Sequence, residues 1–479
     1  MKTTIAVLSK KNKPILPIVI DVLKNNIDGH SLNFTVASPE KILTHKSPDI
    51  LNKQNIKSST IIGCTFTKEA KKTYNFLQIE KSTILFEGTI YTPEIKENFV
   101  QETTRFVHNE TQLQTFIEKT EGDYSLFKLK NQEINVIRDP LGVQPLYYGE
   151  NKEIAAFASN RKTLWQLGID KIWSFPPGNL CLLNKTGFQF KPIKTLTYAE
   201  SKQILMKDAT AELQKLLEQA VKKRVNGLEK VTVAFSGGLD SSLIAYIANK
   251  CGVKVDLVHV SLENEFEVEA AFEASEELGL PMKAYFFKES DVERVLSQVV
   301  NLIEEADPVK LAIGVPFYWT AMRTQEAGHS VLLAGQGADE LFGGYHRYVK
   351  EYCTEGGVKV RQLMFNDIVK MYENNIERDK KICESLGVEL RLPFCSFDLA
   401  EFAIGLPVEL KFESKQDSLR KMVLRRVAAN LGLPELIVNK PKKAIQYSTG
   451  INNAIKRIAQ KNNQTVKEYV IELFQKYHQ

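Results

Sequence analysis

The chain has 479 residues, and its 63 Lys+Arg against 58 Asp+Glu give a formal net charge of only +5. At roughly 100–200 residues per domain, this length predicts two or three domains. A charged fraction of 25% and an aromatic fraction of 9% exclude a disordered, collagen-like or coiled-coil chain. The small net charge gives no electrostatic reason to expect a nucleic-acid partner.

The cysteines are scattered along the chain and form no CxxC pair, which favours a reducing compartment over a disulfide framework. No apolar run approaches the ~18 residues that a membrane helix needs. The apolar stretch near Met1 is too short for a secretory signal. The sequence therefore predicts a cytoplasmic protein that has no membrane partner.

The first part of the chain is built from short apolar or alternating runs that are separated by turn residues. Such runs are typical of antiparallel sheet, and they predict strands at residues 5–8, 59–63, 83–86, 124–129 and 134–138. Helical periodicity appears at residues 17–26 and 112–119. We expect a strand-rich α+β domain over residues 1–195.

From residue 196 the pattern changes to strands that alternate with helices. A long amphipathic helix is predicted over residues 199–224, and another helix over residues 316–327 precedes a buried strand at 330–333. Alternation at this spacing indicates a parallel, doubly wound sheet. The overall fold class is therefore α/β, with a second domain over residues 196–479.

The strongest chemical signal is VTVAFSGGLDSSLIAYIA at residues 231–248, where a β-branched strand turns into a helix. Glycines in the turn open the backbone amides to a phosphate, and hydroxyl groups and the helix N-terminus add donors. The residues expected to hold a phosphate are Ser236, Gly237, Gly238, Ser241 and Ser242. Asp240 suits a bridging Mg²⁺. Paired glycines alone would predict only a tight turn, but the complete motif at a strand-to-helix junction favours phosphate binding.

This loop resembles the pyrophosphate loop of the ATP pyrophosphatases, an adenine nucleotide α-hydrolase-like fold that adenylates a substrate and releases pyrophosphate. Further segments are similar to motifs of the asparagine synthetases and extend the resemblance across the second domain. They are residues 303–307 (IEEAD), 332–347 (LLAGQGADELFGGYHR), 387–394 (GVELRLPF), 418–423 (SLRKMV) and 439–450 (NKPKKAIQYSTG). For GVELRLPF alone, a Glu–Arg pair that braces a loop is an equal alternative.

The resemblance implies ATP and Mg²⁺ as cofactors. It implies that Asp240 and Asp339 bind Mg²⁺, and that one of Lys442 and Lys443 stabilises the charge that develops on pyrophosphate. Which lysine does so stays open, as does the alternative of a solvated basic face. The remaining implied nucleotide contacts are Val260 and Ser261 at the adenine and Gly335 in the second glycine turn.

Two positions depart from the family pattern. Gln336 occupies a catalytic position that is usually acidic, for which a role in handling the incoming amine has been proposed. A carboxamide cannot act as a base. Cys395 and Ser396 replace the usual Leu-Asp pair. Both departures leave the acceptor acid and the nitrogen nucleophile open.

Within residues 1–195, the segments EGDY (121–124), RDPLGVQPLYY (138–148) and AFAS (156–159) resemble the glutaminase domain of class II glutamine amidotransferases, an N-terminal-nucleophile-hydrolase-like fold. Such a domain uses a cysteine at residue 2, activated by its own α-amine. Here Lys2 stands at that position, and we expect Cys64, the first cysteine, to be a buried strand residue.

The rest of the expected glutamine site is altered as well. Lys46 stands in HKSPD where the family has HRGPD, so the guanidinium fork for the substrate carboxylate is lost. Glu87, next to Gly88, replaces the asparagine whose amide helps to form the oxyanion hole. Asp123 is retained and is suited to hold an amino group. We expect this glutaminase-like domain to be inactive.

These observations predict an ATP-dependent ligase of asparagine biosynthesis. It would adenylate aspartate and amidate it with ammonia, supplied free or by a separate glutaminase; homo-oligomerisation stays open. One alternative is a ligase similar to the beta-lactam synthetases that acts on another carboxylic acid, and a second is a non-catalytic ATP-binding regulator. A tRNA-modifying relative is disfavoured by the small net charge.

Overall fold

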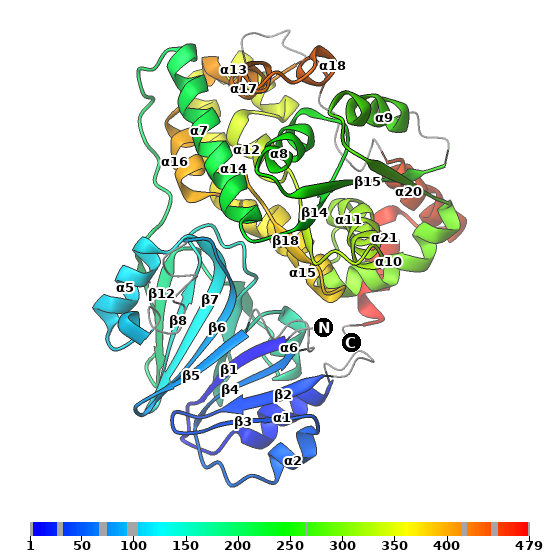
Figure 1. Ribbon diagram of the computed structural model, residues 1–479. Helices are drawn as coiled ribbons and strands as arrows, with labels where there is room; N and C mark the ends of the chain where they lie inside the picture. Colours follow the sequence, from blue (N-terminus) through cyan, green and yellow to red (C-terminus); the bar gives the residue numbers. More distant parts are fainter. Residues whose placement is uncertain are drawn as a thin grey trace. The chain divides into compact units, whose positions relative to one another are not determined.

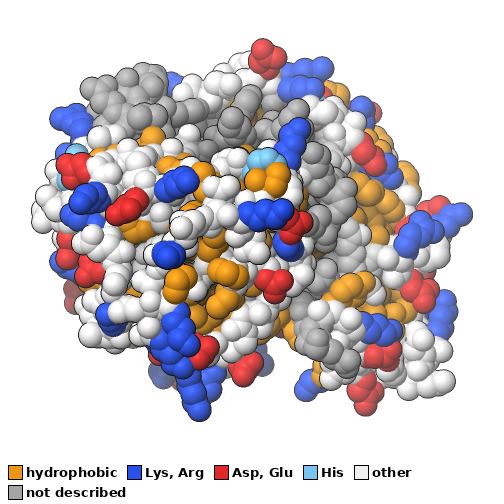
Figure 2. Space-filling view, turned by 90° about the horizontal axis from the view of Figure 1, so that it is seen from below, with side chains coloured by type: hydrophobic (Ala, Val, Ile, Leu, Met, Phe, Trp, Pro, Cys, Tyr) orange, Lys and Arg blue, Asp and Glu red, His pale blue; other side chains and the backbone are white. Residues whose placement is uncertain are grey.

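The computed structural model describes residues 3–25, 32–66, 74–92, 104–263, 267–412, 419–441 and 449–477. The chain divides into two compact units, Met1–Thr195 and Leu196–Gln479 (Figure 1). Among the described residues, no helix has both the length and the apolar composition that crossing a bilayer requires. On the face drawn in Figure 2, basic and acidic side chains are interspersed, in keeping with their near balance in the sequence.

The first unit contains two antiparallel sheets, with strand orders β11-β9-β10-β1-β4-β2-β3 and β13-β12-β8-β7-β6-β5. The strands of the first sheet are β1 (Thr3–Ser9), β2 (Asn33–Ala37), β3 (Ile42–His45), β4 (Thr60–Phe66), β9 (Tyr147–Glu150), β10 (Ile154–Ala158) and β11 (Ile172–Ser174). Those of the second are β5 (Tyr74–Ile79), β6 (Ser82–Ile90), β7 (Gly122–Lys130), β8 (Glu133–Arg138), β12 (Asn179–Asn184) and β13 (Gly187–Pro192).

The two sheets pack face to face, because one apolar core contains Leu8 and Cys64 from the first sheet together with Leu85 and Phe127 from the second. Helices cover the outer faces. The first sheet carries α1 (Leu16–Asn25), α2 (Pro48–Asn52) and α6 (Arg161–Gln166), and the second carries α5 (Glu110–Lys119). This layered sandwich confirms the expected strand-rich α+β class of the first unit.

The second unit is built on one parallel sheet with the order β16-β15-β14-β17-β18. Its strands are β14 (Lys230–Ala234), β15 (Lys254–Leu262), β16 (Met282–Phe287), β17 (Val331–Leu333) and β18 (Glu389–Arg391). The chain starts at β14, moves outward to β16 and then returns to the other side of β14. This order confirms the doubly wound sheet. Ligands bind such sheets where the order reverses, which is between β14 and β17.

Helices flank this sheet, with α7 and α8 packed together on one side and α10 and α11 on the other (Figure 1). The helices before β17 are α7 (Met206–Val225), α8 (Leu239–Lys250), α9 (Glu267–Glu277), α10 (Glu289–Ile303) and α11 (Pro308–Glu326). Those after it are α12 (Ala338–Phe342), α13 (His346–Glu355), α14 (Gly357–Met371), the π-helix η2 (Tyr372–Ile376), α15 (Glu377–Ser385), α16 (Phe397–Gly405), the 3₁₀ helix η3 (Val408–Leu410), α17 (Met422–Asn430), α18 (Glu435–Val438), α20 (Ile451–Lys461) and α21 (Val466–Gln475).

Two predicted helix starts are wrong. The helix expected from residue 199 begins at Met206, because Lys202 N donates to Gly405 O (2.9 Å) instead of entering a helix, and Leu205 is 73% exposed. The helix expected from Pro316 begins at Pro308. Asp307 caps it by accepting from the amides of residues 309 and 310, so Pro316 lies inside the helix.

Candidate active site

The predicted phosphate loop forms a tight turn between β14 and α8. Gly237 has φ +63°, and a Cβ at this position would lie 2.7 Å from Ala271 Cα, so the turn requires glycine. Gly238 is the N-cap of α8, which leaves the first amides of the helix without a side-chain cap. The hydroxyls of Ser236 and Ser241 lie 3.3 Å apart beside these amides. The turn therefore presents donors of the kind that bind a phosphate.

A second turn follows the neighbouring strand β17 and leads into α12. Because β14 and β17 are parallel and adjacent, both turns leave the same edge of the sheet. A cavity of ≈ 190 Å³ lies there. Its lining includes Ser236, Asp240 and Ser241 from the first turn, Gly335, Gln336 and Asp339 from the second, and Val260 from β15.

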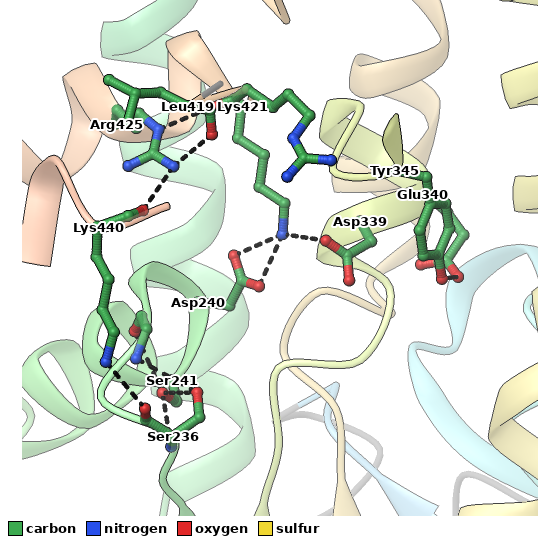
Figure 3. A network of polar contacts seen from close by, with 12 residues as sticks. Ser236, Asp240, Ser241, Asp339, Glu340, Tyr345, Leu419, Lys421, Arg425 and Lys440 are labelled. Atoms are coloured by element: carbon green, nitrogen blue, oxygen red, sulfur yellow. Dashed lines mark hydrogen bonds and ion pairs between the residues drawn. The ribbon is translucent and has the colours of Figure 1, made fainter. Parts of the chain in front are cut away.

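Lys421 brings the two turns together. Its Nζ lies 2.9 and 2.7 Å from the carboxylate oxygens of Asp240 and 2.6 Å from Asp339 Oδ1. Figure 3 shows the lysine side chain reaching between the two carboxylates. The Lys421 side chain is only 2% exposed, and each aspartate side chain is 17% exposed. Two carboxylates from separate elements thus converge on one cationic group.

The backbone that carries Lys421 adopts an uncommon conformation. Arg420 and Lys421 have φ values of 54° and 57°, in the left-handed region that few residues other than glycine adopt. The buried Arg425 guanidinium holds this backbone by donating to Arg420 O (2.7 Å) and to Leu419 O. It also donates to Lys440 O (3.0 Å) and Val438 O, so one side chain links the turn of Lys421 to the start of the downstream basic segment (Figure 3).

Glu340, the residue after Asp339, lies in a buried hydrogen-bonded pocket. Its Oε1 accepts from Tyr345 Oη (2.6 Å) and from Asn375 Nδ2 (2.7 Å). Burial, followed by the neighbouring Asp339 charge, raises the pKa of the Glu340 carboxyl. Tyr345 and Asn375 also line the cavity, so Glu340 supports its wall from behind.

Gln336 lines the cavity and contacts a second buried carboxylate. Its Nε2 donates to Asp379 Oδ2 at 2.5 Å. Asp379 is fully buried and also accepts from the guanidinium of Arg378. Burial raises the pKa of the Asp379 carboxyl, against the lowering effects of the Arg378 charge and of the hydrogen bonds from Arg378 and Gln336.

Known proteins share sequence similarity with both units of this chain. The family model described as asparagine synthase matches residues 212–358 and 350–474, and a glutamine amidotransferase domain model matches residues 76–166. A putative glutamine-hydrolysing asparagine synthetase from Methanocaldococcus jannaschii is 32% identical over 393 residues, which is 72% of each chain. The chain belongs to the asparagine synthase family. This is a family of ATP-dependent carbon–nitrogen ligases, as the resemblance led us to expect.

More distant relatives are longer than this chain. A glutamine-hydrolysing asparagine synthetase from Asparagus officinalis is 26% identical over 352 residues, covering 70% of this chain and 58% of its own length. Among solved structures, a glutamine phosphoribosylpyrophosphate amidotransferase from B. subtilis is 14% identical with a TM-score of 0.34, covering 59% of this chain and 65% of its own. The chain thus spans less than two thirds of the plant relative.

Only some of the nucleotide-binding residues expected in this asparagine synthase family member line the cavity. Ser242 and Ser261 are fully buried and are not among the residues that line the cavity. Lys442 and Lys443 lie outside the described residues. Lys440 is the first lysine of residues 439–450, and the sequence did not single it out. Its Nζ is 3.4 Å from Ser236 O (Figure 3).

Two family motifs of the second unit make structural contacts. Arg391 donates to both oxygens of Glu389, at 2.8 and 3.0 Å, which is the bracing pair considered as an alternative for GVELRLPF. In IEEAD, Glu304 pairs with Lys381 at 3.1 Å and Asp307 caps α11. None of these five residues is among those that line the cavity, so their contacts are structural.

In the first unit, the carboxylates of the altered glutamine site are buried. Glu87 is 2% exposed and accepts from Gln144 Nε2 at 3.2 Å. Asp123 is 1% exposed and accepts from Tyr91 Oη at 2.7 Å. A Cβ at Gly88 would overlap Asp123 O, so the backbone beside Glu87 requires glycine.

The other residues expected in this unit differ in exposure. Lys46 is exposed just after β3, and Lys2 lies outside the described residues. Cys64 is fully buried in β4, which confirms the expected strand cysteine. Burial raises the pKa of the Cys64 thiol and raises that of Cys181 to about 12. Neither thiol of this unit is therefore an activated nucleophile.

Proposed function

We propose that this member of the asparagine synthase family adenylates the β-carboxylate of aspartate with ATP and then amidates it with ammonia. The observation that carries the proposal is the meeting of Asp240 and Asp339 at the point where the strand order of the parallel sheet reverses. A donor-rich turn lies beside them, and a cavity opens onto all of these groups.

The residues fit Mg²⁺. Magnesium prefers oxygen ligands, and two carboxylates that converge on one cationic group supply them. Asp240 and Asp339 would hold the ion. When bound there, it would neutralise negative charge on the phosphates and so favour departure of pyrophosphate.

The chain's own residues would perform the binding steps. Backbone amides at the start of α8 and the hydroxyls of Ser236 and Ser241 would hold the pyrophosphate end of ATP. An aspartate β-carboxylate oxygen would attack the α-phosphorus, and the bond from that phosphorus to pyrophosphate would break. Ammonia would then attack the acyl carbon, with AMP leaving and a proton released to solvent.

Ammonia is the proposed nitrogen source because the glutaminase-like unit is poorly equipped for glutamine hydrolysis. Glu87 would set a buried carboxylate where an oxyanion must be stabilised. The exposed Lys46 lacks the bidentate fork of an arginine. We therefore propose that this unit is inactive, and that nitrogen arrives as free ammonia or from a separate glutaminase.

The test is a direct assay with aspartate, Mg²⁺ and ATP, supplied with either ammonium or glutamine. We expect asparagine, AMP and pyrophosphate in equal amounts with ammonium and none with glutamine. Turnover with glutamine alone would refute the proposed nitrogen source. If aspartate is adenylated but neither ammonium nor glutamine yields asparagine, ammonia is not the nucleophile.

A second candidate is a ligase that joins a different amine to an adenylated carboxylate. The observation that favours it is Gln336, a neutral side chain that faces the cavity at a position where an acidic residue is usual. A screen of carboxylic acids by pyrophosphate release would distinguish the two. If aspartate is inactive and another acid is active, the second function holds.

A further inference from the structure

Gln336 faces the cavity on one side and a buried carboxylate on the other. It lines the same cavity as Asp240 and Asp339. Its Nε2 donates to Asp379 Oδ2 at 2.5 Å, and Asp379 is 0% exposed and lies behind the cavity wall on α15. Asp379 itself does not line the cavity. Any effect of Asp379 on a ligand therefore passes through Gln336 or Arg378.

The contacts of Asp379 fix the direction of the Gln336 carboxamide. Arg378 Nε donates to Oδ1 at 2.7 Å, and Arg378 Nη2 donates to Oδ2 at 3.0 Å. An ionised carboxylate only accepts hydrogen bonds, so the NH₂ group of Gln336 must face it. The carbonyl oxygen Oε1 is then the atom of this carboxamide that remains to accept from another group.

The local helix geometry brings this pair to the cavity. The π-helix η2, at Tyr372–Ile376, immediately precedes Arg378 and Asp379 in α15. A π turn holds an extra residue and so changes the direction in which the following side chains point, and such turns occur frequently at functional sites. Asn375, within η2, also contacts Glu340 and lines the cavity. Two separate contacts thus join this region to Gln336 in the second glycine turn and to Glu340 in the following helix α12.

We propose that Asp379 is a positioning residue that holds Gln336 Oε1 toward the cavity, where this oxygen accepts an N–H from the attacking nitrogen nucleophile. This inference rests on the proposed amide-forming function. With one N–H held by Oε1, the nitrogen lone pair is left to form the bond to the acyl carbon. The bond from that carbon to AMP breaks with its electron pair on the phosphate oxygen, and a proton passes to solvent. Gln336 orients the amine and takes no proton.

Charge placement supports this role. Arg378 offsets the charge of Asp379, so Gln336, Arg378 and Asp379 together carry no formal net charge. The pairing of Gln336 with Asp379 keeps an acceptor oxygen at residue 336, while the negative charge lies on Asp379 behind the cavity wall. A neutral acceptor suits a neutral amine, whose N–H groups need a hydrogen-bond partner but no counter-ion.

The experiment compares Asp379→Asn, Gln336→Glu and the double exchange Gln336→Glu/Asp379→Asn in the full chain. Adenylation is measured alone by ATP–pyrophosphate exchange with aspartate, and amidation by the KM for ammonium and by kcat. We expect Asp379→Asn to raise the KM for ammonium roughly tenfold, because the amide at residue 336 loses its fixed direction. Exchange should stay near the wild-type rate.

The double exchange gives the sharpest test. Gln336→Glu alone sets two carboxylates within hydrogen-bond distance, so we expect lower thermal stability and weak amidation. In the double variant the carboxylate and the amide change places, so residue 336 again presents an oriented acceptor oxygen. The KM for ammonium should therefore return most of the way to the wild-type value. Glu384→Gln, the same chemical change later on α15, is the matched control and should leave both steps unchanged.

The outcomes separate this inference from the proposed function. If the Asp379→Asn variant changes exchange as much as amidation, or if the double variant is no better than Gln336→Glu, Asp379 has only a structural role and the inference is overturned. If none of the carboxylic acids tested supports ATP–pyrophosphate exchange by the wild-type chain, the proposed function fails, and this inference fails with it. Thermal unfolding of every variant identifies any loss that comes from misfolding.

Discussion

Lys421 donates to both carboxylate oxygens of Asp240, at 2.9 Å to Oδ1 and 2.7 Å to Oδ2. The same ammonium group lies 2.6 Å from Asp339, so it is the shared counter-ion of two carboxylates that would otherwise repel each other. A divalent cation at these carboxylates would change this balance, since one lysine offsets only half of their charge. Lys421 and Mg²⁺ are therefore both expected to offset the negative charge of Asp240 and Asp339.

We expect Lys421→Met to lower the free energy of unfolding in metal-free buffer by about 3 kcal/mol, because it leaves two partly buried carboxylates uncompensated. Added Mg²⁺ should raise the unfolding temperature of this variant more than that of the wild type, since the ion relieves that repulsion. Thermal unfolding with EDTA and with Mg²⁺ measures both effects. Lys467→Met, on an exposed position of α21, is the control. Equal stability of Lys421→Met and wild type in EDTA would contradict the prediction.

Gly344 provides the space in which Lys421 meets Asp339. A Cβ at residue 344 would overlap Asp339 Oδ1 and Lys421 Cε. We expect Gly344→Ala to displace this ion pair and lower the unfolding temperature. Gly357→Ala is the matched control, because its Cβ would lie 3.6 Å from the nearest neighbours at the start of α14. Calorimetric unfolding of both variants tests this, and an equally small effect of the two substitutions would refute it.

The sequence predicts those parts of the site that local patterns determine. The strand, turn and helix around Ser236 follow from adjacent residues, and the parallel alternation of strands and helices predicts that two such turns share an edge. The role of Lys421 is not accessible in this way. It lies in SLRKMV, a segment that the family resemblance identifies, but its contacts with Asp240 and Asp339 depend on a left-handed backbone held by Arg425.

Helix boundaries cannot be predicted from the sequence for a similar reason. The apolar periodicity of residues 199–224 continues through Leu205, but the backbone of Lys202 bonds to Gly405, more than two hundred residues away in sequence. The pairing of Gln336 with Asp379 spans 43 residues, and Asp379 follows the π-helix η2. Tertiary contacts of this kind override local propensity and leave no periodic signal.

Arg425 is expected to control nucleotide affinity from outside the cavity. Its guanidinium donates to the backbone beside Lys421 and to Lys440 O, so it fixes two segments that bear basic side chains. Arg425→Lys keeps the charge but loses the planar fork. We expect affinity for Mg-ATP to fall about tenfold, as measured by titration calorimetry.

Arg426→Lys is the matched control for this prediction, because residue 426 is the exposed neighbour on α17. It should leave nucleotide affinity unchanged. Circular dichroism establishes that both variants are folded. Equal affinities of the two variants would show that the Arg425 contacts do not position the nucleotide site.

Lys411 gives the protein a pH-dependent stability. Its side chain is buried, its Nζ donates to Ala403 O at 2.7 Å, and burial, with a smaller effect of Arg361, lowers its pKa from 10.5 to about 7. Above pH 7 the folded chain holds this lysine neutral while the unfolded chain still protonates it, so the unfolded state binds more protons. The free energy of unfolding should therefore rise with pH between about 7 and 10.

Lys411→Met removes this penalty. We expect the variant to exceed the wild type in free energy of unfolding by a few kcal/mol at or below pH 7, with the difference shrinking by about 1.4 kcal/mol per pH unit above it. Urea denaturation of both proteins at pH 7 and pH 9.5 measures this difference, and Lys359→Met, exposed on α14, should show none. A difference that does not change with pH would mean that Lys411 keeps its proton in the fold, because only a proton lost on folding makes the two curves converge.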